Sequence, residues 1–84
     1  MFFMYILRSK KNGKYYVGAT HCLEKRLRQH NAGKIRSTKG LIPLEIVYSE
    51  SYTTNSEARK RESCLKRRKS RKFIESLITT KNYI

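Results

Sequence analysis

Two tyrosines lie eleven residues apart near the start of the sequence, and an arginine and a histidine follow, four residues apart. One glutamate occupies the middle of a later apolar stripe. Hydrolysis of a phosphodiester needs a base to activate water, a cation to oppose the charge that develops, and often a metal ion. A tyrosine or histidine, an arginine and a carboxylate would supply one of each. The residues in question are Tyr5, Tyr16, Arg26, His30 and Glu62.

Each of these residues also has a structural explanation. Paired tyrosines in a hairpin commonly serve sheet packing, and a histidine near a helix C-terminus interacts favourably with the helix dipole. Arg26 and Glu62 could form an ion pair that neutralises two half-buried charges. Taken singly, the residues favour these structural roles, whereas their joint placement favours a site.

The two tyrosines are predicted to lie on the paired strands of a hairpin. Residues 2–8 form a continuous apolar, β-prone run, which is typical of a strand covered on both faces. Asn12-Gly13 is a strong hairpin signal, and residues 15–19 return as the second strand. Antiparallel pairing of these strands would bring the two tyrosines close together.

Arg26 and His30 are predicted to lie on a helix that Thr20 caps and that runs to about His30. Leu23 and Leu27 define its buried stripe. At about 100° per residue, Arg26 and His30 lie within about 60° of Leu23, on the border of that stripe. The helix would therefore hold both side chains at the edge of its core-facing surface.

The segment after this helix is predicted to lead into a third strand. Asn31 and Gly33 are expected to end the helix. Residues 35–41 are rich in Lys, Arg, Ser and Gly and are predicted to form a loop. Pro43 precedes a strand over residues 44–48. Three alternate residues are expected to share one face of that strand: Leu44, Ile46 and Tyr48.

Glu62 is predicted to lie on a second helix, which begins at the capping box formed by Thr54 and Glu57. The inward face of this helix contains Ala58 and Leu65, at i and i+7, and Glu62 lies between them at i+4. A carboxylate is thus placed within an apolar stripe.

The chain is predicted to end in a third helix capped by Ser70, with an apolar face made of Phe73, Ile74, Leu77 and Ile78. The expected element order is β-β-α-β-α-α. The fold class is therefore α/β (α+β), a small three-stranded antiparallel sheet flanked by helices, in one domain over residues 1–84.

The charge balance is strongly basic. There are 20 lysines and arginines against 6 acidic residues, a formal net charge of +14, which favours a polyanionic partner: nucleic acid ahead of an anionic membrane surface. All acids are glutamates, which argues against the multi-carboxylate cluster of a two-metal phosphodiesterase. Nine basic residues fall within residues 59–72, either a phosphate-binding surface or a solvated helix face. The residues expected to contact phosphates are Arg8, Arg28, Lys39 and Lys66.

Several other classes of protein do not fit. Cys22 and Cys64 are too few for a disulfide-stapled module. With His21 and His30 they make four potential zinc ligands, but the spacing is unlike any compact zinc motif. The apolar run at residues 2–7 is too short to span a membrane and lacks a basic n-region. We therefore expect a soluble cytoplasmic protein with reduced thiols and no membrane partner.

Four segments together resemble the GIY-YIG nuclease superfamily, and in particular its small single-domain UPF0213 group, over nearly the whole chain. The first motif reads Phe3-Met4-Tyr5, which keeps only the tyrosine, and the second reads Tyr16-Val17-Gly18. Residues 23–31, LEKRLRQHN, resemble the first-helix motif of the family. Residues 61–66, RESCLK, resemble the segment with the metal-binding glutamate.

The resemblance implies a role for each matched residue. Arg26 and His30 match the active-site arginine and histidine, and Glu62 matches the glutamate that holds one divalent cation, usually Mg²⁺, with Mn²⁺ as an alternative. The arginine is implied to stabilise the pentavalent phosphate, and a tyrosine, helped by the histidine, to activate water. Which of these groups is the general base stays open. The late asparagine of the family has one candidate, Asn82.

The function that this resemblance implies is metal-dependent cleavage of DNA. Because we expect no second domain to read base edges, phosphate contacts would give affinity without sequence information. The expected substrate is therefore branched, nicked or flapped DNA, in a role of the repair or recombination type. Two alternatives stay open: a non-catalytic nucleic-acid-binding module of the same fold, and an RNA- or ribosome-associated basic protein. Magnesium-dependent nicking separates the enzyme from both, and competition by RNA separates the two.

Overall fold

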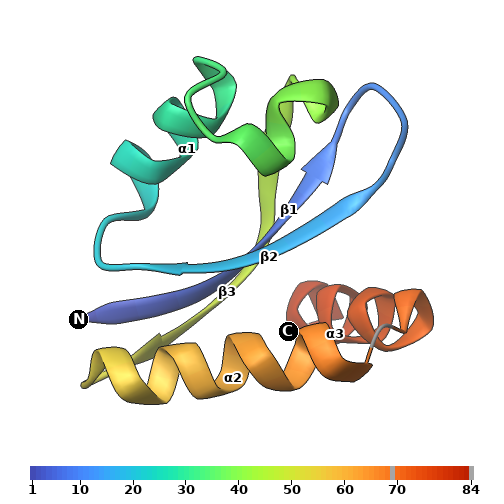
Figure 1. Ribbon diagram of the computed structural model, residues 1–84. Helices are drawn as coiled ribbons and strands as arrows, with labels where there is room; N and C mark the ends of the chain where they lie inside the picture. The colour runs from blue at the N-terminus through green and yellow to red at the C-terminus, as the bar shows by residue number, and fades with distance from the viewer. Residues whose placement is uncertain (69, 84) are drawn as a thin grey trace.

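A three-stranded antiparallel sheet forms the middle layer of the molecule, between two layers of helices (Figure 1). The computed structural model describes residues 1–68 and 70–83, and the side chains of residues 1–68 and 70–80. Its elements are β1 (Phe2–Ser9), β2 (Tyr15–Thr20), α1 (Leu23–Asn31), the 3₁₀ helix η1 (Arg36–Leu41), β3 (Leu44–Tyr52), α2 (Asn55–Arg68) and α3 (Arg71–Tyr83). The strand order is β2-β1-β3. The predicted fold class and element order are confirmed, with one added 3₁₀ helix.

Residues 2–7 of the central strand β1 are apolar because helices cover both faces of the strand there. Met4 and Ile6 pack with Leu65 on the side of α2 and α3, whereas Tyr5 and Leu7 pack on the side of α1 and η1. These four side chains are at most 2% exposed. Successive residues of a strand point to opposite faces, so a strand between two helix layers needs apolar side chains at every position.

The hairpin between β1 and β2 forms as the Asn12-Gly13 pair predicts. Gly13 has a φ of +76°, a left-handed conformation that glycine adopts without steric cost. The N–H of Gly13 donates to the carbonyl of Ser9 at 2.8 Å, and the N–H of Lys14 donates to Oδ1 of Asn12 at 3.0 Å. These bonds set the register in which Tyr5 lies opposite Gly18.

The predicted cap of α1 is wrong, because Thr20 is still part of β2. The helix begins at Leu23 with Cys22 at its N-cap position and no side-chain cap. The hydroxyl of Thr20 instead accepts a hydrogen bond from the N–H of Cys22 at 3.2 Å, within the connection. Gly33, with a φ of +77°, follows the C-terminus of the helix as predicted.

The sequence predicts a loop over residues 35–41. Residues 36–41 instead form the 3₁₀ helix η1, which folds back on the C-terminal turn of α1. The predicted third strand also ends too early, since β3 continues to Tyr52 and pairs with β1 as far as Phe2. A bulge shifts the register between Ile6 and Leu7. Tyr48 therefore packs on the α2 side and Ile46 on the α1 side, so the predicted shared face of these two residues is wrong.

The two C-terminal helices begin as their caps predict. The N–H of Glu57 donates to Oγ1 of Thr54 at 3.2 Å, and the N–H of Phe73 donates to Oγ of Ser70 at 3.1 Å. Ala58 and Leu65 are buried on the inward face of α2, which directs the residue between them, Glu62, toward the sheet. No helix within the described residues is long and apolar enough to cross a lipid bilayer.

Candidate active site

A buried chain of hydrogen bonds joins β1, α1 and η1. Oη of Tyr5 and Nε2 of His30 are 3.0 Å apart, and Nδ1 of His30 and Oγ1 of Thr38 are 2.7 Å apart. The Thr38 hydroxyl also donates to the carbonyl of Ile35 at 3.4 Å. We assign the Thr38 proton to the carbonyl of Ile35, so that the hydroxyl oxygen accepts from Nδ1–H of His30 and Nε2 accepts the phenolic proton of Tyr5. All three side chains are at most 2% exposed.

His30 is held in its neutral form. Burial, and to a smaller extent the positive charge of Arg26, together lower its pKa to about 4. Burial also raises the pKa of Tyr5, a change that the Arg26 guanidinium opposes. At neutral pH the pair is therefore a phenol that donates to a neutral imidazole.

The second tyrosine lies on the same face of the sheet but is more accessible. Tyr16 pairs with Leu7, two residues beyond Tyr5 on β1, and its ring meets the His30 ring edge-on with centroids 5.2 Å apart. The Tyr16 side chain is partly exposed, and Nζ of Lys66 lies 5.5 Å from its ring centroid. The predicted proximity of the two tyrosines through the hairpin is confirmed, and only Tyr16 presents its ring to solvent.

The glycine of the second motif makes space for the first tyrosine. Gly18 is the cross-strand partner of Tyr5, and a Cβ atom at position 18 would lie 2.5 Å from Oη and 2.6 Å from Cζ of Tyr5. The Tyr5 ring thus lies over the Gly18 backbone, and this position places its hydroxyl at His30. The spacing of the Tyr-x-Gly motif therefore has a direct steric reason.

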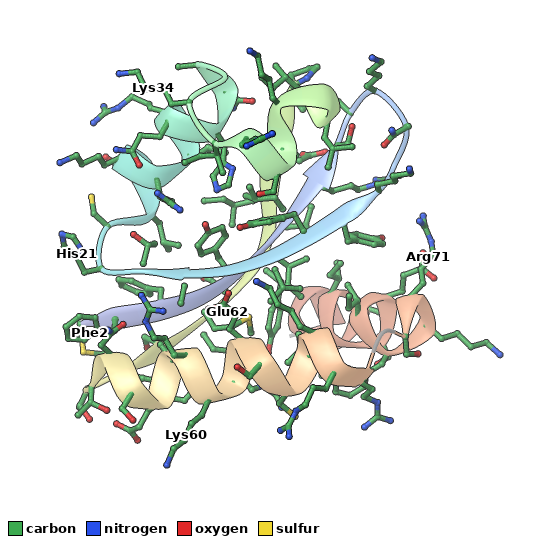
Figure 2. The ribbon with its side chains drawn as sticks, in the orientation of Figure 1. Phe2, His21, Lys34, Lys60, Glu62 and Arg71 are labelled. Carbon is green, nitrogen blue, oxygen red and sulfur yellow. The ribbon has the colours of Figure 1, made fainter. Side chains whose placement is uncertain are left out.

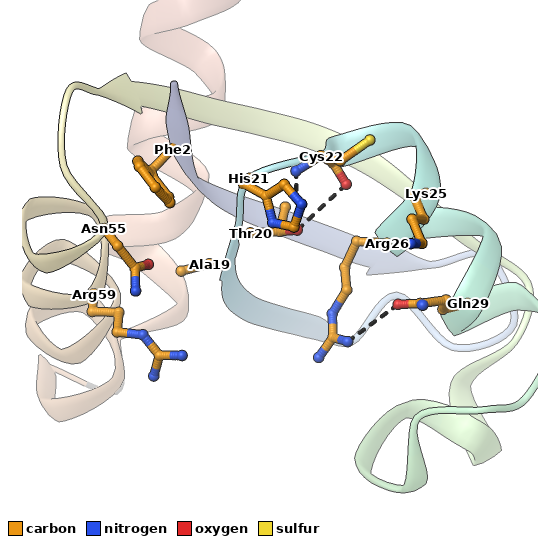
Figure 3. A pocket seen from close by; sticks show the side chains of 10 residues that line it. All are labelled: Phe2, Ala19, Thr20, His21, Cys22, Lys25, Arg26, Gln29, Asn55 and Arg59. Carbon is orange, nitrogen blue, oxygen red and sulfur yellow. Dashed lines mark hydrogen bonds between the residues drawn. The ribbon is translucent and has the colours of Figure 1, made fainter.

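Arg26 extends from α1 into the space between α1 and α2 (Figure 3). Its Nη1 donates to Oε1 of Gln29 at 3.2 Å. Its Nε is buried and has no hydrogen-bond acceptor among the described residues. An unsatisfied buried donor on a cation is costly, and a phosphate oxygen is an acceptor that would satisfy it.

Glu62 lies on α2, in the helix layer on the other face of the sheet. Its side chain rises from α2 towards the edge strand β2 (Figure 2) and is 19% exposed. Its Oε2 accepts from Nζ of Lys66 at 2.7 Å. Among the described residues the Glu62 carboxylate pairs with Lys66 and no ion pair joins it to Arg26, so the structural pair proposed from the sequence is not the arrangement found.

The residues present fit a divalent cation held in one particular way. Within the described residues no group of three or more His, Cys, Asp or Glu side chains is close enough to form a metal cage. Mg²⁺, however, is commonly bound by one or two carboxylates together with water and substrate phosphates. Glu62 is one partly exposed carboxylate whose charge, like that of Arg26, acts on Tyr5, and Nε of Arg26 lacks an acceptor. That donor set suits Mg²⁺ shared with a bound phosphate.

The remaining predicted residues lie at different places. Arg8 is exposed on β1 near its turn into β2, and Arg28 and Lys39 are exposed on α1 and η1. Lys66 contacts the site through Glu62 and Tyr16. The side chain of Asn82 lies outside the described residues. The two cysteines are free: Cys22 is partly buried before α1, and Cys64 is exposed on α2.

Sequence reasoning missed Thr38. This residue is fully buried and completes the hydrogen bonds of His30, yet it falls in the segment predicted as a loop. A lone threonine eight residues after the histidine carries no sequence signal, because its partner is chosen by how η1 folds back on α1. The Glu62–Lys66 pair was also missed, although its i,i+4 spacing with the acid first is a recognised helical ion-pair pattern.

Comparisons with known proteins identify the family of the chain. Residues 1–75 match the GIY-YIG catalytic domain. The UPF0213 protein YazA of Bacillus subtilis is 35% identical over an alignment of 86 positions, covering 98% of this chain and 86% of YazA. A UPF0213 protein of Staphylococcus epidermidis is 44% identical over 61 residues, covering 71% of this chain and 73% of that protein.

A solved structure shows the same fold. The solution structure of a UPF0213 protein from Bacillus halodurans superimposes with a TM-score of 0.59 at 31% identity, covering 96% of this chain and 86% of the other. The names of these relatives state no activity. The motif tyrosines, the sheet that pairs them and the match over residues 1–75 together show that the chain belongs to the GIY-YIG family, within its UPF0213 group.

Proposed function

We propose that this protein is a metal-dependent DNA endonuclease that selects DNA structure rather than sequence. The observation that carries the proposal is the convergence of an Arg26 guanidinium whose buried Nε lacks an acceptor, a partly exposed carboxylate on Glu62, and the tyrosines joined through His30. The family match supports nuclease chemistry in general. Dependence on Mg²⁺, or on Mn²⁺ in its place, and action on DNA in repair or recombination within the cytoplasm are our extensions of it.

Arg26 is assigned to the scissile phosphate. Its planar guanidinium can donate two parallel hydrogen bonds to phosphate oxygens, and Nε already lacks an acceptor. The charge that Arg26 opposes grows as the phosphate becomes pentavalent, so its contribution is larger in the transition state than in the ground state. A bound phosphate would also offset the positive charge that helps to lower the pKa of His30.

We assign the orientation of the attacking water molecule to Tyr16. Tyr5 is only 2% exposed and its hydroxyl is engaged by His30, so a water molecule has little access to it. Tyr16 is partly exposed and lies next to the Glu62–Lys66 pair. Its phenol oxygen can accept a hydrogen bond from the attacking water and orient it. Tyr5 and His30 then act as positioning residues, because the His30 ring packs edge-on against Tyr16.

Glu62 would hold the divalent cation, which when bound stabilises negative charge on the phosphate oxygens. Lys66 must release the carboxylate for this to happen, because its ammonium lies 2.7 Å from Oε2. The lysine of that ion pair is 49% exposed, and ion pairs open to solvent contribute little stability. Exchange of one cation for another is therefore energetically accessible.

The proposal is tested by comparing wild type with Glu62→Gln on nicked, flapped, branched and linear DNA, with Mg²⁺ or with chelator. We expect wild type to cleave only with Mg²⁺, and the variant to lose on the order of a hundredfold or more in rate while still binding DNA. Glu24→Gln, which removes an exposed carboxylate from α1, is the matched control and should cleave normally. Cleavage that resists both chelator and the Glu62 substitution would reject the proposal.

A second candidate function is a nucleic-acid-binding module without turnover. The Glu62–Lys66 pair favours it, since a carboxylate already neutralised by lysine has less need of a metal ion. In that case wild type binds DNA, Mg²⁺ changes neither binding nor melting temperature, and no DNA form is cleaved. Competition by RNA then decides whether the bound nucleic acid is DNA or RNA.

A further inference from the structure

A basic pocket of about 400 Å³ lies beside the candidate active site, between α1 and the first turns of α2 (Figure 3). The end of β2 and the connection after it form its floor. Arg26 lines the pocket, so the pocket is continuous with the predicted position of the scissile phosphate. A volume of this size is within the range of small-molecule sites.

The pocket wall has the charge of a phosphate site. Lys25 and Arg26 contribute from α1 and Arg59 contributes from α2. Among the described residues that line it, none is acidic. The basic groove at the β1–β2 hairpin is different, because Glu45 lines it together with Arg8 and Arg71. In Figure 3 the guanidinium groups of Arg26 and Arg59 extend into the space between the two helices.

An aromatic side chain completes the pocket. Phe2, at the start of β1, lines it next to Asn55 and is partly exposed. Aromatic rings beside cationic groups are the usual means by which proteins hold single-stranded nucleic acid, since a base stacks on the ring while its phosphate is neutralised. A base can reach such a ring only when it is out of the duplex stack.

We propose that this pocket binds the nucleotide adjoining the scissile phosphate, with its phosphate at Arg59 and its unpaired base against Phe2. The inference rests on the proposed function, to which it adds a substrate class: DNA that is single-stranded next to the point of cleavage. The unpaired base is then the feature by which the protein selects flapped or branched DNA over an intact duplex.

The test measures binding of a short fluorescent oligothymidylate in the presence of chelator, so that hydrolysis plays no part. Arg59→Gln and Lys60→Gln each lower the net charge by one from +14. They are neighbours on α2, but only Arg59 lines the pocket. We expect Arg59→Gln to weaken binding on the order of tenfold and to reduce the salt slope by about 1. Lys60→Gln should weaken it by no more than about twofold.

Phe2→Leu keeps an apolar side chain but removes the ring. It should weaken single-strand binding on the order of fivefold and leave duplex binding unchanged. Equal losses in the Arg59 and Lys60 variants would overturn the phosphate site, and single-strand binding by Phe2→Leu equal to wild type would overturn the base contact. Arg59-specific loss of binding without any cleavage by wild type would reject the proposed nuclease and keep the pocket. Cleavage by wild type, together with equal losses of binding in the Arg59 and Lys60 variants, would keep the proposed nuclease and reject the pocket.

Discussion

Thr38 decides which nitrogen of His30 carries the proton. With its hydroxyl proton assigned to the carbonyl of Ile35, its oxygen accepts from Nδ1–H, and Nε2 is then the acceptor for Tyr5. In the other tautomer Nε2 carries the proton and faces the phenolic O–H of Tyr5. Two donors would then meet, and the Tyr5 hydroxyl would have to rotate. The small buried hydroxyl of Thr38 thus sets the direction of the hydrogen bonds from Tyr5 through His30.

Replacing Thr38 with Val is expected to leave Nδ1–H of His30 without an acceptor, at a cost of about 1–3 kcal/mol in unfolding free energy. The rate of DNA cleavage should fall on the order of tenfold as the tautomer becomes mixed. Thr38→Ser keeps the hydroxyl and should retain the wild-type tautomer. Nitrogen NMR of the His30 ring, beside urea denaturation, measures both effects. Identical ring spectra for the Val and Ser variants would contradict this role.

His30 should make stability depend on pH in a defined window. Its pKa is about 4 in the folded protein, where burial is the main cause, against about 6.5 in the unfolded chain. The unfolded state therefore binds a proton first, so the contribution is complete above about pH 6.5 and is lost as the pH falls toward 4. The loss between pH 7 and pH 5 is expected to be about 2 kcal/mol.

Denaturation of wild type, His30→Gln and His21→Gln across this range measures that contribution. The His30 variant should lack the loss. The His21 variant, changed at an exposed position before α1, should keep it. If both variants keep the full loss, another group is responsible for it.

At the scale of elements, the pairing of β1 with β2 determines whether the site exists. Tyr5 lies directly across from Gly18. Tyr16 lies two residues before Gly18 on β2 and is on the same face of the sheet. A shift of β2 by one residue would move Tyr16 to the α2 face, away from Tyr5. The Asn12-Gly13 turn and the absent side chain at Gly18 together prevent that shift.

Gly18→Ala is expected to displace the Tyr5 ring, since the new Cβ would lie 2.5 Å from Oη. Overpacking of this kind costs about 1–3 kcal/mol, and cleavage should fall because the bond from Tyr5 to His30 is lost. Gly40→Ala is the control, because nothing lies within 4 Å of a Cβ at that position. Equal melting temperatures and rates for the two variants would show that the strand can relax around the added methyl group.

At the scale of the molecule, the net charge of +14 on 84 residues governs association with nucleic acid. Binding releases counterions from the phosphate backbone, so affinity should fall linearly with salt on a log–log plot. If five or six phosphates are contacted, the slope should be roughly −5, a loss of about a thousandfold between 50 and 200 mM salt. Fluorescence anisotropy over that range gives the slope. A value near zero would remove the electrostatic basis of binding.

The local structure followed from the sequence because short-range chemistry dictates it. The Asn12-Gly13 turn, the Thr54 cap and the Ser70 cap each bond within a few residues, and each forms as predicted. The continuous apolar run of β1 indicated a strand covered on both faces, since any polar residue there would be buried without a partner. The type and spacing of Tyr5 and Tyr16 likewise placed them together.

The tertiary structure decided everything that depends on partners far apart in the chain. Thr38 meets His30 only because η1 folds back on α1. The bulge that turns Tyr48 away from Ile46 arises from pairing with β1. The basic pocket is formed by side chains more than thirty residues apart, Arg26 and Arg59. Periodicity reports which face of an element is buried, but only packing determines which elements share that face.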